Sequence, residues 1–140
     1  MIGLLLALVL VAPRPAPPTP ALAAQIAHAA HRYGIPRQVA FGLVRTESRF
    51  NPWARGSHGE VGLTQILPST GRRVCGLRVD ELWDPARNLD CGFKLFASLR
   101  RRYGSDWLAM VGYNQGPRVA DSIREQGNGY PEKVLAVRYH

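Results

Sequence analysis

Hydrophobic and polar positions follow a helical period along most of the chain, and proline and glycine mark the ends of its segments. In residues 85–103 the apolar positions recur at spacings of three and four, which places them on one helical face: Leu89, Phe93, Phe96 and Leu99. Asp84 before Pro85 is a typical N-cap arrangement, and Gly104 suits a helix end. This stretch is the clearest predicted helix.

The same signals predict further short helices on both sides of it. They span residues 20–33, 36–48, 63–67, 68–76, 107–114, 117–126 and a last stretch from 131 onward, and Asp106 is expected to cap the helix from Trp107. Residues 53–62 contain three glycines and little periodicity, so we expect a loop or a small irregular β element there. The sequence therefore predicts one compact, mainly α domain of about seven short helices.

The N-terminus has a composition of its own. An uncharged apolar run fills residues 1–12, a proline-rich stretch follows, and Ala21-Leu22-Ala23 supplies small residues near a cleavage site. This order is typical of a secretory signal, although no Lys or Arg precedes the apolar run. We expect residues 1–23 to be a signal peptide with a Pro-rich segment and residues 24–140 to be an exported domain of the periplasm or cell envelope. An uncleaved anchor or a misassigned start are the alternatives, and the run is short for a stable membrane span.

Two cysteines, Cys75 and Cys91, form an even count in a chain that we expect to be exported. A disulfide between them is the economical interpretation. It would close a loop of roughly 15 residues, for which chain entropy gives about 3 kcal/mol of stabilisation. Two unrelated buried thiols are the alternative, because only geometry decides pairing.

The chain is basic, with 18 Lys and Arg residues against 10 Asp and Glu residues and a formal net charge of +8. Such a charge favours anionic partners, which include nucleic acid, phospholipid headgroups and the carboxylates and phosphates of a cell wall. Charge alone does not choose among them. The run Arg100-Arg101-Arg102 ends an amphipathic helix, where cations complement the helix dipole and a solvated face is the simpler interpretation.

One acidic residue lies on an apolar helical face. In residues 36–48 that face is marked by Val39, Ala40, Leu43 and Val44, and Glu47 follows at a spacing of three and four. Either the last helical turn is solvated, or Arg45 or Arg49 neutralises the charge, or the carboxyl is buried for chemistry. An apolar setting would raise the pKa of Glu47 and keep it protonated near neutral pH. A protonated carboxyl is the general acid that glycosidic bond cleavage needs.

Glycosidases usually need a second carboxylate. The next acidic residues along the chain are Glu60 and Asp80, and neither has a context that marks it as the partner. Either a distant segment supplies the second group, or the reaction does not use one.

Three blocks in order resemble the lytic transglycosylases, the soluble-lytic-transglycosylase (SLT) domain of the lysozyme-like α+β superfamily. They are ESRFNPWARGSHGEVGLTQILPST at 47–70, DPARNLDCG at 84–92 and YNQGP at 113–117. The resemblance implies cleavage of the β-1,4 bond between N-acetylmuramic acid and N-acetylglucosamine in peptidoglycan. In that family one glutamate, here Glu47, protonates the leaving oxygen and then acts as base toward the C6 hydroxyl of the same sugar, which closes a 1,6-anhydro ring without water.

The resemblance also implies roles for further residues. Tyr113 would orient the glutamate by a hydrogen bond, and three residues would contact the sugars: Ser57, Gln65 and Asn114. Tyr130 would line the cleft, with core packing as an equal alternative. Turn, core and helix-end roles are the simpler alternatives for Ser57, Tyr113 and Asn114 respectively. No cofactor and no metal are expected, since His58 has no second ligand at a useful spacing.

Two positions depart from the family pattern. Thr64 stands where the family usually has methionine, which would remove apolar area near a sugar's acetamido group. Glu60 stands where alanine is usual. It is either a solvated loop charge, the interpretation that the sequence favours, or a cleft residue that raises the pKa of Glu47.

Three other functions compete with this prediction. A goose-type lysozyme on the same fold would use water, but no acidic residue is evidently placed to activate it. A non-catalytic wall-binding component of a secretion apparatus would retain Glu47 for structure only. A nucleic-acid-binding module would explain the charge, and the export signal argues against it. The expected partners are peptidoglycan glycan strands, with a secretion or conjugation machine as a further candidate, and the expected state is a monomer that binds no nucleic acid.

Overall fold

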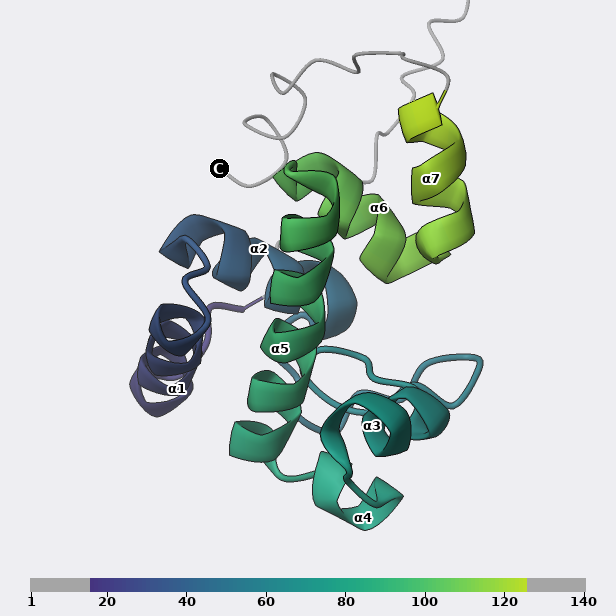
Figure 1. The fold of residues 1–140 in the computed structure, drawn as a ribbon. Coiled ribbons are helices and arrows are strands. Elements are labelled where there is room, and N and C mark those ends of the chain that lie inside the picture. The colour runs from purple at the N-terminus through teal and green to yellow at the C-terminus, as the bar shows by residue number, and fades with distance from the viewer. Residues whose placement is uncertain (1–15, 126–140) are drawn as a thin grey trace, which may run out of the picture.

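The computed structural model describes residues 16–125 and is mainly helical. Figure 1 shows the helices in chain order: α1 (Pro20–Arg32), α2 (Arg37–Ser48), α3 (Pro68–Cys75), α4 (Val79–Leu82), α5 (Pro85–Tyr103), α6 (Asp106–Gln115) and α7 (Pro117–Glu125). Two isolated antiparallel bridges, Arg55 with Val61 and Val61 with Ile66, lie in the segment between α2 and α3. The prediction of a mainly α domain with a small irregular β element after α2 is confirmed.

Helix α5 is the central element of the domain. In Figure 1 helix α1 lies on one side of it and α2 passes behind it, α3 and α4 lie beside its first half, and α6 and α7 lie at its other end. The side chain of Asp84 accepts a hydrogen bond of 2.9 Å from the backbone N–H of Arg87, and Gly104 ends the helix at a φ of 63°. Both helix ends match the sequence prediction, because cap and glycine signals act locally.

The main hydrophobic core forms around the inward face of α5. Phe93 and Phe96 are fully buried there, against Ile26 of α1 and Leu43 of α2. A second cluster lies under α3 and α4 and contains Val61, Ile66, Leu82 and Cys91. The segment between α2 and α3 passes over both clusters, so its apolar residues fix it to the helices that surround it.

The prediction of a helix over residues 63–67 is wrong. Residues 62–65 instead form a turn that is closed by the bridge between Val61 and Ile66, with Gly62 at a φ of 75° and Gln65 at a φ of 52°. Left-handed backbone at two of four positions is incompatible with an α-helix. Leu63 and Ile66 are buried on this turn, which explains why their spacing resembled a helical face.

Two smaller corrections concern helix starts. Ser105, not Asp106, caps α6, because its side chain accepts from the N–H of Leu108 at 3.3 Å and Asp106 is already helical. Helix α4, only four residues long, was not predicted because one turn has no periodicity to detect. The helix expected from residue 131 lies outside the described residues.

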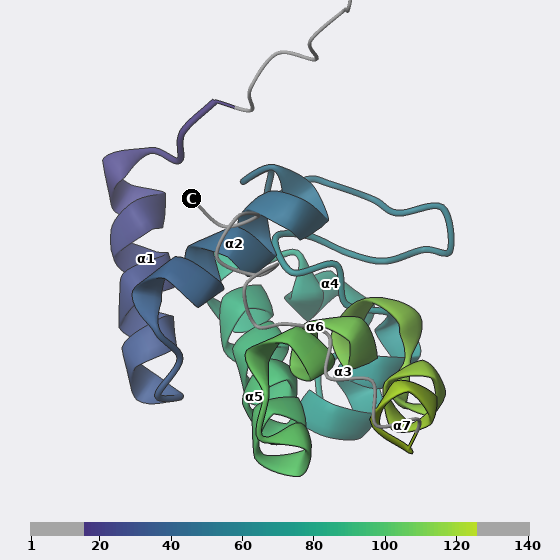
Figure 2. The same ribbon diagram turned by 90° about the horizontal axis from the view of Figure 1, so that it is seen from above.

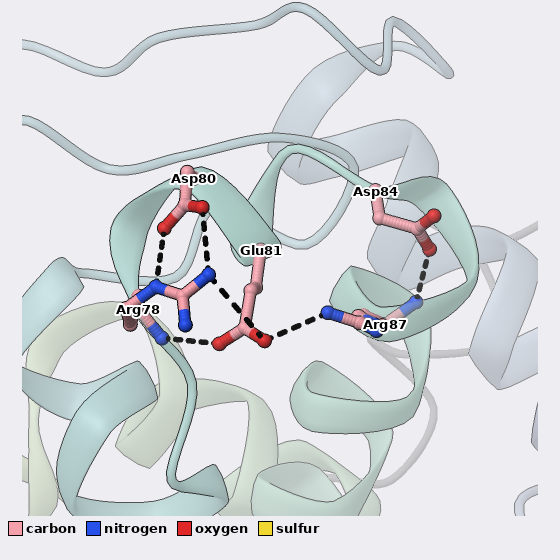
Figure 3. Close-up of polar contacts among 5 residues, drawn as sticks. All are labelled: Arg78, Asp80, Glu81, Asp84 and Arg87. Atoms are coloured by element: carbon pink, nitrogen blue, oxygen red, sulfur yellow. Dashed lines mark hydrogen bonds and ion pairs between the residues drawn. The ribbon is translucent and has the colours of Figure 1, made fainter.

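Charged residues connect α4 to the first turn of α5 (Figure 3). The carboxylate of Glu81 accepts from the backbone N–H of Arg78 at 2.8 Å and from the guanidinium of Arg87 at 2.8 Å. Arg78 also makes two hydrogen bonds of 3.0 Å with Asp80. These contacts are largely exposed, so they define the position of the short helix more than they stabilise the fold.

The predicted disulfide is present between Cys75 and Cys91, with a Cα–Cα distance of 5.7 Å. It joins the end of α3 to the first half of α5. Since Cys91 is buried in the second cluster, the bond also holds α3 against the apolar residues below it. The alternative of two separate thiols is excluded.

The N-terminal prediction is only partly within the described residues, because the apolar run of residues 1–12 lies outside them. Ala23, the expected last residue of the signal peptide, lies in the first turns of α1, and the side chain of Thr19 caps this helix. Leu22 packs against the main core. Within residues 16–125 no helix is long and apolar enough to cross a membrane.

Candidate active site

Glu47 lies in the last turn of α2, on the face that packs against the core. The same face carries Ala40, Leu43 and Val44, all with no exposed surface. The helix ends directly afterwards, because Arg49 and Phe50 adopt left-handed backbone with φ of 53° and 64°. The packing of α2 against the core therefore turns the Glu47 side chain toward the interior of the domain.

The Glu47 side chain is half-buried, and one oxygen of its carboxyl is fully buried without a hydrogen-bond partner. Among the described residues, Oε1 of Glu47 is the one buried side-chain polar atom that has no hydrogen-bond partner. Within residues 16–125, neither Arg45 nor Arg49 forms an ion pair with Glu47. An orphaned buried carboxyl is unusual, because such groups normally find partners or stay in water. Two of the three interpretations from the sequence, a solvated last turn and a neutralised charge, are thus excluded.

Burial, and to a smaller extent the negative charge of Glu60, together raise the pKa of Glu47 to about 7. A carboxyl with this pKa exists in both protonation states near neutral pH. It can therefore donate a proton and later accept one without a change of conditions.

A pocket of about 220 Å³ opens beside this carboxyl. Its walls come from α2, from the turn before α3, and from α3, α5 and α6. The lining residues are Glu47, Glu60, Gln65, Ile66, Leu67, Thr70, Leu95, Tyr113 and Asn114. Four predicted site residues, which are up to 67 positions apart in sequence, thus surround one cavity: Glu47, Gln65, Tyr113 and Asn114.

Tyr113 lies in α6 and connects the pocket to the turn before α3. Its hydroxyl donates a hydrogen bond of 2.7 Å to the backbone carbonyl of Thr64, and its ring packs edge to face on Phe96. Burial raises the pKa of Tyr113, and the nearby charge of Glu47 raises it as well. The hydroxyl thus bonds to the turn and not to the Glu47 carboxyl, which the resemblance had given as its partner.

Gln65 presents its side-chain amide to the pocket in a fixed orientation. The amide nitrogen donates to the backbone carbonyls of Ala54 at 3.0 Å and Gly62 at 2.9 Å. Both N–H donors are therefore used within the protein, which leaves the amide oxygen for a ligand. Asn114 lies at the end of α6, where its amide nitrogen donates to the Met110 carbonyl at 3.3 Å.

Glu60 shares the pocket with Glu47. Its carboxylate accepts from the backbone N–H of His58 at 3.3 Å and lies 3.3 Å from the ring nitrogen of the same residue. The carboxylate lies across Gly56, where an added Cβ would come within 1.6 Å of Oε2. The interpretation that the sequence did not favour, a cleft residue near Glu47, is the one that agrees with the structure.

Thr64 is fully buried and does not line the pocket. Its hydroxyl donates to the side-chain oxygen of Asn88 at 2.7 Å, and its backbone N–H donates to the same oxygen at 2.8 Å. The expectation that Thr64 changes the contact with a sugar's acetamido group is therefore wrong. Residues 61–64 are all buried on this turn, and Gln65 is the first residue after them with partial exposure.

Asn88 is a residue whose role the sequence analysis missed. Beyond its contacts to Thr64, its amide nitrogen donates to the carbonyls of Val61 at 2.8 Å and Leu82 at 3.0 Å. All four hydrogen-bonding positions of the buried amide are thus occupied, and the turn that carries Gln65 is held to α5. The sequence signal that could have indicated this role was an asparagine next to Leu89, at the inward face of an amphipathic helix.

One predicted site residue lies away from the pocket. Ser57 is exposed in the loop after α2, with its hydroxyl 3.2 Å from the ring of His58, and it does not line the pocket. Tyr130 lies outside the described residues.

Comparison with known proteins agrees with this geometry. Residues 24–134 match the family model described as the transglycosylase SLT domain. The chain is 33% identical to the membrane-bound lytic murein transglycosylase C of Haemophilus influenzae, over 80% of this chain and 38% of that protein. It is 31% identical to the transglycosylase of Enterobacteria phage PRD1, over 79% of this chain and 40% of that protein. The chain thus spans about two fifths of the length of these curated relatives.

A solved structure has the same fold. It is an inactive glutamate-to-glutamine mutant of the lytic transglycosylase Slt from Pseudomonas aeruginosa, which matches 70% of this chain and 17% of its own with a TM-score of 0.65 and 27% identity. The family model covers most of the described helices and every residue of the pocket. On these grounds the chain belongs to the transglycosylase SLT domain family.

Proposed function

We propose that this domain cleaves the β-1,4 bond between N-acetylmuramic acid and N-acetylglucosamine in peptidoglycan as a lytic transglycosylase, with Glu47 as its single acid and base. The observation that carries the proposal is the carboxyl of Glu47 on the pocket wall, with one buried oxygen that has no hydrogen-bond partner and a pKa raised to about 7. The printed names of the relatives, lytic murein transglycosylases, support the substrate.

The two proton transfers need a carboxyl of this kind. Protonated Glu47 gives its proton to the bridging oxygen while the bond between that oxygen and C1 of the muramoyl sugar breaks. The resulting carboxylate then takes the proton of the C6 hydroxyl while O6 bonds to C1 and closes the 1,6-anhydro ring. Glu47 ends protonated, no water is consumed, and a pKa near the working pH suits both steps.

The other pocket residues would hold the sugars. The free amide oxygen of Gln65 accepts a hydrogen bond from a hydroxyl or an acetamido N–H, and Asn114 contacts the neighbouring sugar. Tyr113 acts through the turn, because its hydrogen bond to the Thr64 carbonyl fixes the backbone from which Gln65 projects. Sugar contacts by Ser57 and Tyr130 remain predictions from the resemblance.

A second candidate reaction, hydrolysis, is favoured by one observation. Glu60 is a second carboxylate on the wall of the Glu47 pocket, and a paired carboxylate is what a water-using glycosidase needs as base or nucleophile. In that reaction Glu60 would remove a proton from water, and the product would carry a reducing end.

Digestion of purified peptidoglycan by wild type, Glu47→Gln and Glu60→Gln separates the two reactions. We expect wild type and Glu60→Gln to release anhydromuramoyl products, each lighter than the hydrated product by one water, and Glu47→Gln to release none. Mass spectrometry of the products is the measurement. Hydrated ends from wild type that disappear in Glu60→Gln would replace transglycosylation by hydrolysis. Full activity of Glu47→Gln would remove Glu47 from its role.

We also propose that the domain works in the cell envelope, where its substrate lies. The name of the Haemophilus relative, which is membrane-bound, supports this location. Opening the wall for a secretion or conjugation machine is one use of the activity, and co-purification with the components of such a machine would test it.

A further inference from the structure

An exposed tryptophan lies outside the pocket, in the loop that leaves α2. Trp53 is 73% exposed, more than any other large hydrophobic side chain among the described residues. Its indole stacks on that of Trp83, with ring centroids 6.2 Å apart and an interplanar angle of 28°. The guanidinium of Arg55 lies 5.5 Å from the centroid of Trp83. We call these three side chains, Trp53, Trp83 and Arg55, the Trp53 platform.

The backbone holds Trp53 in this exposed position. Arg49 and Phe50 both adopt left-handed backbone, which is unfavourable for residues with a Cβ and persists only when the surrounding structure imposes it. The N–H of Trp53 then donates to the side-chain oxygen of Asn51 at 3.0 Å, and Pro52 restricts the backbone between them. A large apolar side chain that is exposed on a fixed turn is a sign of a binding surface.

Two members of the Trp53 platform, Trp53 and Arg55, belong to the same hydrogen-bonded segment as the pocket wall. The carbonyl of Ala54, next to Trp53, accepts from the side chain of Gln65 at 3.0 Å and from the N–H of Gly62 at 2.8 Å. Arg55 forms a backbone bridge with Val61. Figure 2 shows this segment as the long loop that follows α2 and extends away from the helices before it returns to α3.

We propose that the Trp53 platform is a second carbohydrate subsite, which binds sugars of the same glycan strand that is cleaved at Glu47. The proposal rests on the proposed function. In a β-1,4-linked strand the ring substituents are equatorial, so each sugar face presents C–H bonds. These carry partial positive charge and are attracted to the negative face of an indole. A strand is longer than a 220 Å³ pocket can hold, so it continues over the neighbouring surface.

Arg55 adds a charge that suits this substrate. Muramoyl sugars and their stem peptides carry carboxylates, and a guanidinium binds a carboxylate with two parallel hydrogen bonds. Arg55 is exposed, its guanidinium lies against the Trp83 ring on which Trp53 stacks, and it forms no ion pair among the described residues, so it can bind a carboxylate of the strand. The combination of an aromatic surface and a cation distinguishes peptidoglycan from an uncharged glycan.

The test uses the full chain with Glu47→Gln to prevent cleavage. Each test variant adds one further substitution to this inactive parent: Trp53→Ala, Trp53→Phe or Arg55→Ala. The control variant adds Val79→Ala, which removes another exposed apolar side chain, on α4. Affinity is measured by co-sedimentation with purified peptidoglycan and by titration with the N-acetylglucosamine tetramer. Thermal unfolding checks that each variant is folded.

We expect Trp53→Ala to weaken binding of both probes by about tenfold, as for the loss of one aromatic contact. Trp53→Phe should recover most of the affinity, Arg55→Ala should weaken only peptidoglycan binding, and Val79→Ala should change neither. Equal affinity of Trp53→Ala and its parent for both probes would overturn the subsite.

The two proposals fail in different ways. Absence of any peptidoglycan cleavage by the wild-type chain contradicts the proposed function, whatever Trp53 does. Normal cleavage by wild type together with unchanged binding by Trp53→Ala contradicts only the subsite.

Discussion

Replacing Glu47 by glutamine should stabilise the domain at neutral and alkaline pH while it abolishes activity. Burial raises the pKa of Glu47 from an ordinary 4.5 to about 7. At 1.36 kcal/mol for each pH unit, this difference means that the folded state disfavours the ionised carboxyl by about 3 kcal/mol. Glutamine has nearly the same shape and no charge, so it removes this penalty.

The sign follows from proton linkage. Between pH 4.5 and about 7 the folded protein retains a proton on Glu47 that the unfolded chain has lost, so the free energy of unfolding falls as pH rises. Below pH 4.5 both states are protonated and the variant has no electrostatic advantage. Above pH 7 both are ionised, and the advantage of Glu47→Gln is complete.

Urea unfolding of wild type and Glu47→Gln between pH 4 and pH 8.5 measures this difference. We expect the gap between the two free energies of unfolding to widen by about 3 kcal/mol across the range and then to level off. Glu60→Gln is the matched control, because loss of its charge should move the widening to lower pH. A gap that does not vary with pH would refute the view that Glu47 is buried without a partner.

Three further predictions concern the surroundings of the pocket. Asn88→Ala leaves buried backbone groups without partners and should lower the free energy of unfolding by roughly 2 to 4 kcal/mol and reduce kcat, as urea unfolding and peptidoglycan digestion would measure. Reduction of the disulfide between Cys75 and Cys91 should remove about 3 kcal/mol, which thermal unfolding with and without reductant detects. Gly56→Ala displaces the carboxylate of Glu60 and should shift the pH profile of kcat toward lower pH, whereas an unchanged profile would deny Glu60 its electrostatic effect.

Much of the helical architecture could be predicted because its determinants are local. Helix α5 agrees with the sequence at both ends, since Asp84, Pro85 and Gly104 act on their own neighbours. The turn at residues 63–67 was mistaken for a helix because Leu63 and Ile66 have helical spacing, whereas their burial comes from two bridges and two left-handed residues. Backbone of this kind at Gln65, a non-glycine residue, leaves no pattern in the sequence.

The candidate site was predictable to a similar extent. The inward placement of Glu47 follows from helical spacing, and its burial agrees. The position of Glu60 depends on the path of a loop and on the absence of a side chain at Gly56, which no periodicity reports. The hydrogen bond from Tyr113 to the Thr64 carbonyl joins segments 49 residues apart and depends on the packing of α6 on α5.

The buried contact between Thr64 and Asn88 limits how this pocket can be altered, by evolution or by an engineer. A Cβ added at Gly92 would lie 2.3 Å from the Thr64 hydroxyl, so position 92 has no room for a residue larger than glycine. Exchanging Thr64 for methionine removes its hydroxyl hydrogen bond to Asn88 and places a longer side chain beside Gly92. We therefore expect substitutions at positions 64, 88 and 92 to have non-additive effects on the free energy of unfolding.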